Sequence, residues 1–156
     1  MTQPAVLFVC LGNICRSPLA EAAFRLAADE AGLAVEVDSA GTGDWHVGHP
    51  PDHRAQEVAR ANGIDISHYR ARQLTADDFH RFDHILVMDR SNLTDAAARA
   101  PADAPVRPMM LLDLVPGREG AEVSDPYYGG EEFFEATWED VTRAARALVA
   151  RLQSAG

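Results

Sequence analysis

Residues 6–22 read VLFVCLGNICRSPLAEA and combine a buried strand, a short loop and the start of a helix. The apolar run Val6–Val9 ends at Cys10, and Arg16 follows after a five-residue loop. Ser17-Pro18 predicts that a helix starts there, because serine caps helices and proline suits the first helical position. The first N–H groups of a helix lack partners inside it, and the helix dipole adds positive charge there. The pattern therefore predicts a cradle for an anion with a cysteine at its floor.

The loop residues suit one tetrahedral oxyanion, since their backbone N–H groups can curl around it. Gly12 permits backbone angles that a side chain forbids, and Asn13 tolerates left-handed geometry. The planar guanidinium of Arg16 matches two phosphate oxygens. The positive field favours the thiolate of Cys10, which is the reactive form, so we expect attack on phosphorus. The expected phosphate-binding residues are Leu11, Gly12, Asn13, Ile14, Cys15, Arg16 and Ser17.

Composition limits the class of protein. The length fits one domain, residues 1–156, that can bury a core. Twenty-four acidic and fourteen basic residues give a net charge of −10, which opposes binding to nucleic acid or to an anionic membrane. No apolar run is long enough to span a bilayer, and no basic-then-apolar leader opens the chain. We expect a cytoplasmic protein with no nucleic-acid or membrane partner.

The two cysteines of the chain, Cys10 and Cys15, both lie in the loop. Their number excludes a disulfide framework and a four-cysteine zinc site, and suits a reducing compartment. Two interpretations of Cys15 stay open: a small buried residue, or a resolving thiol that traps oxidised Cys10 in a reversible disulfide. His46, His49 and His53 have no carboxylate pattern around them, so we expect no metal site.

Apolar runs alternate with helical patterns along the chain, which favours a parallel α/β sheet. The expected strands are Ala5–Val9, Val35–Ser39, His84–Met88 and Val106–Leu112. The expected helices are Pro18–Ala31, Asp52–Asn62, Ser91–Ala100 and Glu131–Leu152. Cys10 follows the first strand, at the edge where an open parallel sheet binds its ligands.

A second motif, Asp125-Pro126-Tyr127-Tyr128-Gly129-Gly130, precedes the last helix. A cysteine that attacks a phosphate ester needs a proton donor for the leaving group, and Asp125 is the candidate. Pro126 stiffens the chain after the aspartate, and the two tyrosines can form a wall beside an arene. By itself such a segment indicates only a turn. Its weight comes from its pairing with the cysteine loop.

The two motifs together resemble the low-molecular-weight protein tyrosine phosphatase family. Further stretches agree with that family: Ser39–Thr42, Trp45, Pro51-Asp52, Gly63–Leu74 (GIDISHYRARQL) and Met88–Leu93. The resemblance implies a doubly wound α/β fold, with a four-stranded parallel sheet flanked by helices on both faces. It implies hydrolysis of phosphotyrosine in proteins or peptides, and of small aryl phosphates, through a phosphocysteine intermediate without a cofactor or metal.

The same resemblance implies a role for each site residue. Cys10 would be the nucleophile, Arg16 the phosphate clamp and Asp125 the general acid, while Ser17 would hydrogen-bond the thiolate. The residues that it implies as supports of the strained loop are Asn13, Ser17, Ser39 and His68. The residues that it implies as the rim selecting an aromatic ring are Trp45, Tyr127 and Tyr128.

Three alternative functions compete with this expectation. A thiol-dependent arsenate reductase relays oxidation to cysteines outside the loop, and this chain has none there. A protein arginine phosphatase goes with a threonine in mid-loop and smaller residues after the aspartate, whereas Ile14 and Tyr127-Tyr128 stand here. A non-catalytic phosphate-binding regulatory module would lack Cys10, Arg16 or Asp125, and all three are present. We therefore expect a tyrosine phosphatase.

Overall fold

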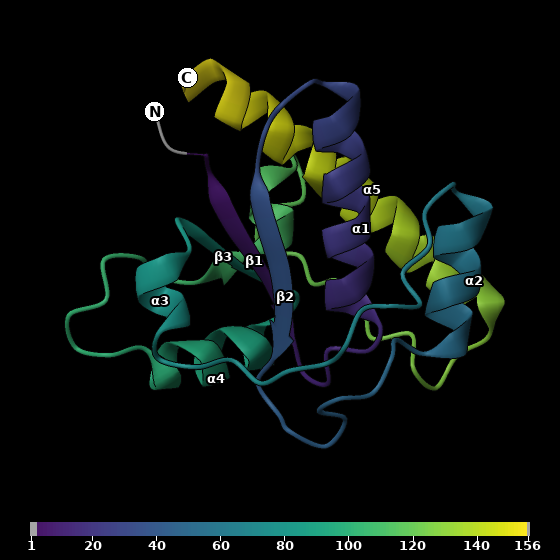
Figure 1. Cartoon of the computed structure of the whole chain (residues 1–156), viewed down its shortest axis with the longest axis horizontal. Coiled ribbons are helices and arrows are strands. Elements are labelled where there is room, and N and C mark those ends of the chain that lie inside the picture. The colour runs from purple at the N-terminus through teal and green to yellow at the C-terminus, as the bar shows by residue number, and fades with distance from the viewer. Residues whose placement is uncertain (1–2, 156) are drawn as a thin grey trace.

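A parallel sheet forms the middle layer of the structure, a computed structural model that describes residues 3–155. Its strands lie in the order β2-β1-β3-β4, and every neighbouring pair is parallel (Figure 1). The strands are β1 (Ala5–Cys10), β2 (Glu36–Gly41), β3 (His84–Val87) and β4 (Met109–Met110). The predicted four-stranded parallel sheet is confirmed.

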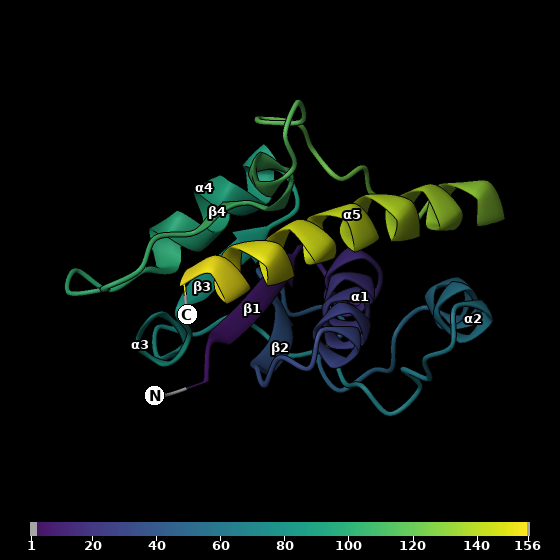
Figure 2. The same ribbon diagram turned by 90° about the horizontal axis from the view of Figure 1, so that it is seen from above.

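Helices cover both faces of this sheet. They are α1 (Arg16–Glu30), α2 (His53–Ala61), α3 (Asp78–Arg81), α4 (Arg90–Arg99) and α5 (Glu131–Ala155), with a 3₁₀ turn at Leu111–Leu114. Helices α1 and α5 lie on one face, with α2 beyond them, and α3 and α4 lie on the other (Figure 2). Successive side chains of a strand point to opposite faces. Val6 and Phe8 accordingly join the core on the α1–α5 face, and Leu7 and Val9 join the core on the other.

The order of the strands places the end of β1 at a switch point. From β1 the chain runs through α1 to β2 on one side, whereas β3 pairs with the opposite edge of β1. Ligands of open α/β sheets bind at the carboxyl ends of strands where the order reverses. Cys10, the last residue of β1, lies at this point as the sequence predicted.

Two predicted boundaries were wrong. Helix α1 begins at Arg16 with Cys15 in the cap position, so Ser17 lies inside the first turn and does not cap the helix. Strand β4 is limited to Met109–Met110, because Pro108 lacks an N–H for the ladder and the 3₁₀ turn begins at Leu111. Within residues 3–155, no helix is both long enough and apolar enough to cross a bilayer.

Candidate active site

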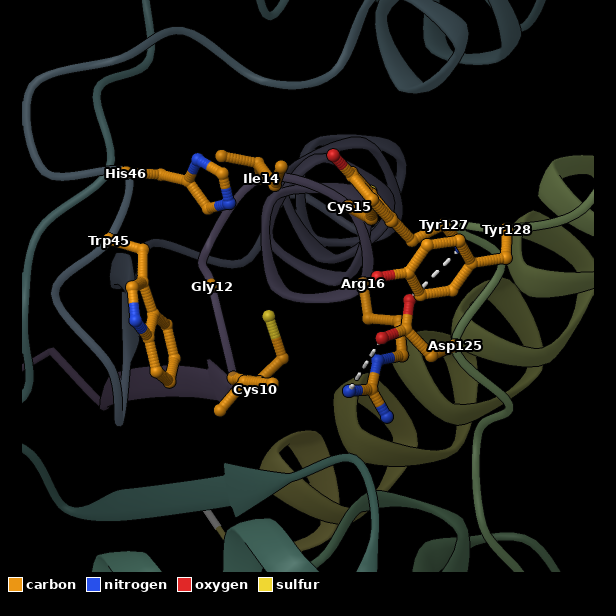
Figure 3. A pocket seen from close by; sticks show the side chains of 11 residues that line it. Cys10, Gly12, Ile14, Cys15, Arg16, Trp45, His46, Asp125, Tyr127 and Tyr128 are labelled. Atoms are coloured by element: carbon orange, nitrogen blue, oxygen red, sulfur yellow. Dashed lines mark hydrogen bonds and ion pairs between the residues drawn. The ribbon is translucent and has the colours of Figure 1, made fainter.

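A cavity of about 230 Å³ opens at the carboxyl end of β1, with the Cys10 sulfur at its floor (Figure 3). Three segments that are far apart in the sequence meet there: the loop after β1, the loop after β2 and the loop before α5. Its lining residues are Cys10, Leu11, Gly12, Ile14, Cys15, Arg16, Trp45, His46, Asp125, Tyr127 and Tyr128. The structure therefore brings Cys10, Arg16 and Asp125 together, as the sequence predicted.

The loop between β1 and α1, residues 11–15, has the curled backbone that the sequence suggested. Asn13 adopts a φ of 58°, in the left-handed region, and its N–H points at the Cys10 sulfur at 3.3 Å. The chain after β2 braces the loop, since Thr42 N donates to Cys10 O at 2.9 Å. A side chain at Gly41 would come within 2.7 Å of the Leu11 carbonyl oxygen, so this close approach requires glycine.

Five side chains form one hydrogen-bonded chain that ends at the Cys10 sulfur. Ser39 Oγ donates to Glu21 Oε1 at 2.8 Å and accepts from Asn13 Nδ2 at 3.0 Å. The same nitrogen donates to Ser17 Oγ at 2.7 Å, and Ser17 Oγ lies 3.1 Å from Cys10 Sγ. Because an amide nitrogen only donates, Ser17 Oγ must accept from Asn13, and its own proton can go to the Cys10 sulfur at 3.1 Å or to Ala40 O at 3.4 Å. A hydroxyl donor at this distance stabilises the thiolate.

The oxygen of the Asn13 amide is held by Arg72, a contact that no sequence motif indicated. Arg72 N donates to Asn13 Oδ1 at 3.0 Å, and a backbone N–H can only face an oxygen, so the orientation of the amide is set. The Arg72 guanidinium donates to both carboxylate oxygens of Asp78 and to Asp38, each at 3.0 Å. Asp78 therefore supports the loop through Arg72, beyond its position at a helix start.

Arg16 is buried, and its guanidinium is held on one side by protein groups. Nη1 donates to Asp89 Oδ2 at 2.6 Å and to Val123 O at 3.0 Å, while Nη2 lies 3.7 Å from Asp125 Oδ2. Burial disfavours the charged form, but the charge at Cys10 and the bond to Asp89 outweigh burial and raise the pKa of Arg16. Nη2 is left to bind an anion in the cavity. Asp89 lies two residues after the end of β3, as the cap of α4, so it is a carboxylate at the same edge of the sheet as Cys10.

Asp125 and three aromatic side chains surround the mouth of the cavity. The Asp125 side chain is 45% exposed, and its Oδ1 accepts from Tyr127 N at 3.1 Å. Tyr127 and Tyr128 form an edge-to-face pair on one side of the opening, and Trp45 stands on the opposite side (Figure 3). Trp45 is 67% exposed and Tyr128 is 96% exposed, so both present apolar surface to solvent. The site can accept a flat apolar group above a bound anion.

His68 does not occupy the position expected of a loop support. It is exposed, and its ring packs edge-to-face on Tyr69 with centroids 5.0 Å apart. Among the described residues, Asn13 donates to Ser17, Ser39 and Cys10 and accepts from Arg72, and none of its hydrogen bonds involves His68. Tyr69 lies instead beside Glu21 and Arg25, and burial together with Glu21 raises the pKa of Tyr69 to about 12.

The second cysteine lines the cavity as a neutral thiol. Cys15 is buried, and burial, with further contributions from Asp52 and Cys10, raises the pKa of its thiol. At neutral pH Cys15 is therefore protonated and is a poor nucleophile. Both cysteines are free in the structure.

His46 is a lining residue that the sequence analysis considered only as a metal ligand. Its ring packs on Gly12, where an added Cβ would lie 3.1 Å from the His46 ring carbon Cδ2. Gly12 therefore makes room for the histidine beside the loop. The loop residues around His46 are polar and show no periodic pattern, so the sequence does not indicate which way the His46 side chain points.

Comparison with known proteins agrees with this geometry. A family model described as low molecular weight phosphotyrosine protein phosphatase matches residues 5–156. A protein of that name from Schizosaccharomyces pombe is 47% identical over 132 residues, covering 83% of this chain and 84% of the relative. The crystal structure of YfkJ from Bacillus subtilis superposes with a TM-score of 0.91 at 39% identity, covering 99% of this chain and 98% of that one.

The fold also resembles that of the arginine phosphatase YwlE, with a TM-score of 0.87 at 28% identity, covering 96% of this chain and 95% of that chain. The fold is thus shared by enzymes with different phosphoamino-acid substrates. The family model spans nearly the whole sequence, and the relative from fission yeast matches most of its own length. This chain belongs to the low-molecular-weight phosphotyrosine protein phosphatase family.

Proposed function

We propose that this protein hydrolyses phosphotyrosine in proteins or peptides, and small aryl phosphates, through a phosphocysteine intermediate. The observation that carries the proposal is the grouping of Cys10, Arg16 and Asp125 in one cavity with an aromatic mouth. The anion-binding floor suits a phosphate, and the aromatic mouth suits the phenyl ring that carries it.

In the first step the Cys10 thiolate attacks phosphorus in line with the departing oxygen. Arg16 Nη2 and the loop N–H groups hold the other three phosphate oxygens and neutralise their charge. Asp125, protonated, gives its proton to the phenolate oxygen as the P–O bond breaks. Tyrosine has a pKa near 10, so departure without that proton is slow at neutral pH. The products are the tyrosine side chain with its hydroxyl restored, phosphocysteine and an Asp125 carboxylate.

In the second step a water molecule attacks the phosphocysteine. The Asp125 carboxylate takes a proton from the water as its oxygen bonds to phosphorus and the S–P bond breaks. Inorganic phosphate leaves, and the sulfur retains the electron pair as thiolate. The Ser17 hydroxyl, 3.1 Å from Cys10 Sγ, stabilises that thiolate as the leaving group.

Tyrosine is favoured over arginine as the phosphorylated residue by the groups around the opening. Ile14 lines the cavity with an apolar side chain, and Tyr127 and Tyr128 present aromatic surface. A guanidinium is polar and charged, so burying it against these groups would cost more free energy than burying a phenyl ring.

For Cys15 we propose the role of a resolving thiol. Hydrogen peroxide would oxidise the Cys10 thiolate to a sulfenic acid, and the Cys15 thiol would then condense with it, forming an S–S bond and releasing water. A dithiol reductant would restore both thiols. Because the mechanism needs a free Cys10 thiolate, we propose that the protein works in a reducing compartment, the cytoplasm.

The role of Asp125 can be tested with aryl phosphates whose leaving groups differ in acidity. In Asp125→Asn, kcat/KM for phenyl phosphate should fall by about 100-fold or more, the usual contribution of a general acid. The more acidic nitrophenol needs less help, so p-nitrophenyl phosphate should lose much less. Equal losses for both substrates would remove Asp125 from the role of proton donor.

A further inference from the structure

The loop that carries Asp125 is weakly attached to the rest of the protein. Between residues 124 and 130 only Pro126 is buried. The backbone and side-chain hydrogen bonds inside the segment are local, from Tyr127 N to Asp125 and from Gly129 N to Pro126 O. Such a segment samples many positions unless another element holds it. A general acid must lie within hydrogen-bond reach of the leaving oxygen, so something must fix this loop.

One side chain from outside the segment holds its backbone, and it belongs to α2. Arg54 Nη2 donates to Tyr127 O and Nη1 donates to Gly129 O, both at 2.8 Å. Across the part of the chain that the structure describes, these are the hydrogen bonds that tie residues 124–130 to an earlier element, beside the longer ion pair of 3.7 Å between Arg16 and the Asp125 side chain. The guanidinium carbon also lies 4.6 Å from the centroid of the Phe134 ring, at the start of α5. Arg54 therefore bridges α2, the Asp125 loop and α5.

Asp52 holds Arg54 in place and connects it to the phosphate-binding loop. Its two carboxylate oxygens accept from Arg54 Nε at 3.0 Å and from Arg54 Nη2 at 3.1 Å. Burial opposes the charge of Asp52, but the hydrogen bonds and charge of Arg54 outweigh burial and lower the pKa of Asp52. The Asp52 N–H donates to Ile14 O at 2.8 Å, inside the cysteine loop. A continuous path of hydrogen bonds thus joins the loop of residues 11–15 to the segment of residues 124–130.

We propose that Arg54 is a positioning residue, which holds Asp125 over the leaving oxygen by fixing the backbone of residues 127–129 relative to the cysteine loop. The proposal rests on the proposed function, because it concerns the proton donor of that reaction. Arg54 does not line the cavity and touches no reacting atom. Misplacing a reacting group by about 1 Å can cost about 100-fold in rate, so a residue outside the cavity can affect the chemistry.

Arginine suits this position better than lysine. Its planar fork donates in fixed directions to two carbonyls and a carboxylate at once, and its flat face rests on the Phe134 ring. An ammonium group is a point charge without a fixed direction. Arg54→Lys would keep the positive charge beside Asp52 but lose most of the geometry. The Arg54→Lys variant therefore distinguishes an effect of hydrogen-bond geometry on activity from an effect of charge.

The test compares kcat/KM for phenyl phosphate and p-nitrophenyl phosphate. Arg54→Ala should lower the value for phenyl phosphate by about tenfold and that for p-nitrophenyl phosphate by less than about threefold, since only the first depends strongly on the proton donor. The kcat/KM of Arg54→Lys for phenyl phosphate should lie between the values for Arg54→Ala and wild type. Arg60→Ala, which removes an exposed arginine from the same helix, is the matched control and should match wild type. The inhibition constant of inorganic phosphate measures anion binding by the loop of residues 11–15, and it should not change in Arg54→Ala.

A double variant provides the deciding result. If Arg54 acts through Asp125, adding Arg54→Ala to Asp125→Asn should lower kcat/KM for phenyl phosphate by less than about twofold, because the interaction has already been lost. A full further tenfold loss, or equal losses for the two substrates in Arg54→Ala, would overturn the proposal. If the wild-type protein releases no phosphate from either substrate, the proposed function itself is wrong. That outcome can be distinguished from the two outcomes that would overturn only the role of Arg54.

Discussion

The amide nitrogen of Asn13 lies 2.7 Å from the Ser17 hydroxyl oxygen, and this contact makes that oxygen a hydrogen-bond acceptor. Ser17 therefore keeps its own proton to donate, and of the two acceptors within reach the Cys10 sulfur at 3.1 Å is nearer than Ala40 O at 3.4 Å. Glu21, at the far end of the chain of hydrogen bonds, accepts the proton of the Ser39 hydroxyl, so the Ser39 oxygen is in turn an acceptor for the Asn13 amide. The Cys10 sulfur is thus joined to a chain of groups that do not line the cavity.

Replacing Ser17 should weaken the stabilisation of the Cys10 thiolate. Ser17→Ala removes one hydrogen bond to a charged sulfur, worth about 1.5–3 kcal/mol, so kcat should fall by at least about tenfold. Alkylation of Cys10 by iodoacetate at pH 6, followed by mass spectrometry, should slow in parallel because iodoacetate reacts with the thiolate. Ser91→Ala, an exposed serine on α4, serves as the control. An unchanged alkylation rate in Ser17→Ala would show that the hydroxyl does not stabilise the sulfur.

The ion pair between Arg16 and Asp89 should matter for stability as well as for binding. Asp89→Ala leaves a buried guanidinium without its partner and removes the cap of α4, so the free energy of unfolding should fall by about 3 kcal/mol or more. Asp89→Asn keeps a capping side chain and should cost about 1 kcal/mol less. Urea unfolding measures both, with Asp95→Ala on the exposed side of α4 as control. A loss below about 0.5 kcal/mol in Asp89→Ala would contradict this role.

Glu21 should make the stability of the protein depend on pH. Burial raises its pKa above the ordinary value of 4.5, despite hydrogen bonds from Ser39 and Arg25. The folded protein then binds this proton more tightly than the unfolded chain, so the free energy of unfolding falls as the pH rises from about 4.5 through the raised pKa. Glu21→Gln lacks the titrating group. Urea unfolding from pH 4 to 7 should show wild type losing stability relative to Glu21→Gln across this window, and a difference that is constant with pH would refute it.

Cys15 should decide whether oxidation can be reversed. After brief treatment with hydrogen peroxide, the wild-type protein should recover most of its own untreated activity when dithiothreitol is added. In Cys15→Ala the sulfenic acid at Cys10 has no resolving thiol and proceeds to sulfinic acid, which dithiothreitol does not reduce. Peptide mass spectrometry should show a Cys10–Cys15 disulfide in wild type only. Equal recovery in both proteins would leave Cys15 as a buried residue without a redox role.

The helices on both faces were implied by the family resemblance, whereas the parallel sheet and the position of Cys10 could be predicted from the residues alone. Their signals are local: apolar runs such as Val6–Val9, and a helix pattern beginning next to Arg16. The start of α1 was misplaced by the Ser17-Pro18 cap signal, because the hydroxyl that suits a cap is used here on the Cys10 sulfur. Tertiary hydrogen bonding outweighed the local preference.

The support of the cysteine loop could be predicted only in part. Asn13 and Ser39 meet as expected, whereas His68 turns to solvent and Arg72 supplies a contact through its backbone N–H. Residues 65–75 form no long helix or strand, so no periodicity indicates which side chains face inward. The role of Arg54 could not be predicted either, because it depends on where residues 127–129 lie in the folded structure.

The most direct measurement is phosphate release, at mildly acidic pH and without added metal, from matched peptides that carry phosphotyrosine, phosphoserine or phosphoarginine. The cavity with its cysteine floor and aromatic mouth predicts release from the phosphotyrosine peptide alone, and no release by Cys10→Ser. Release chiefly from the phosphoarginine peptide would contradict the role given to Ile14, Tyr127 and Tyr128. Release that persists in Cys10→Ser would contradict the phosphocysteine mechanism itself.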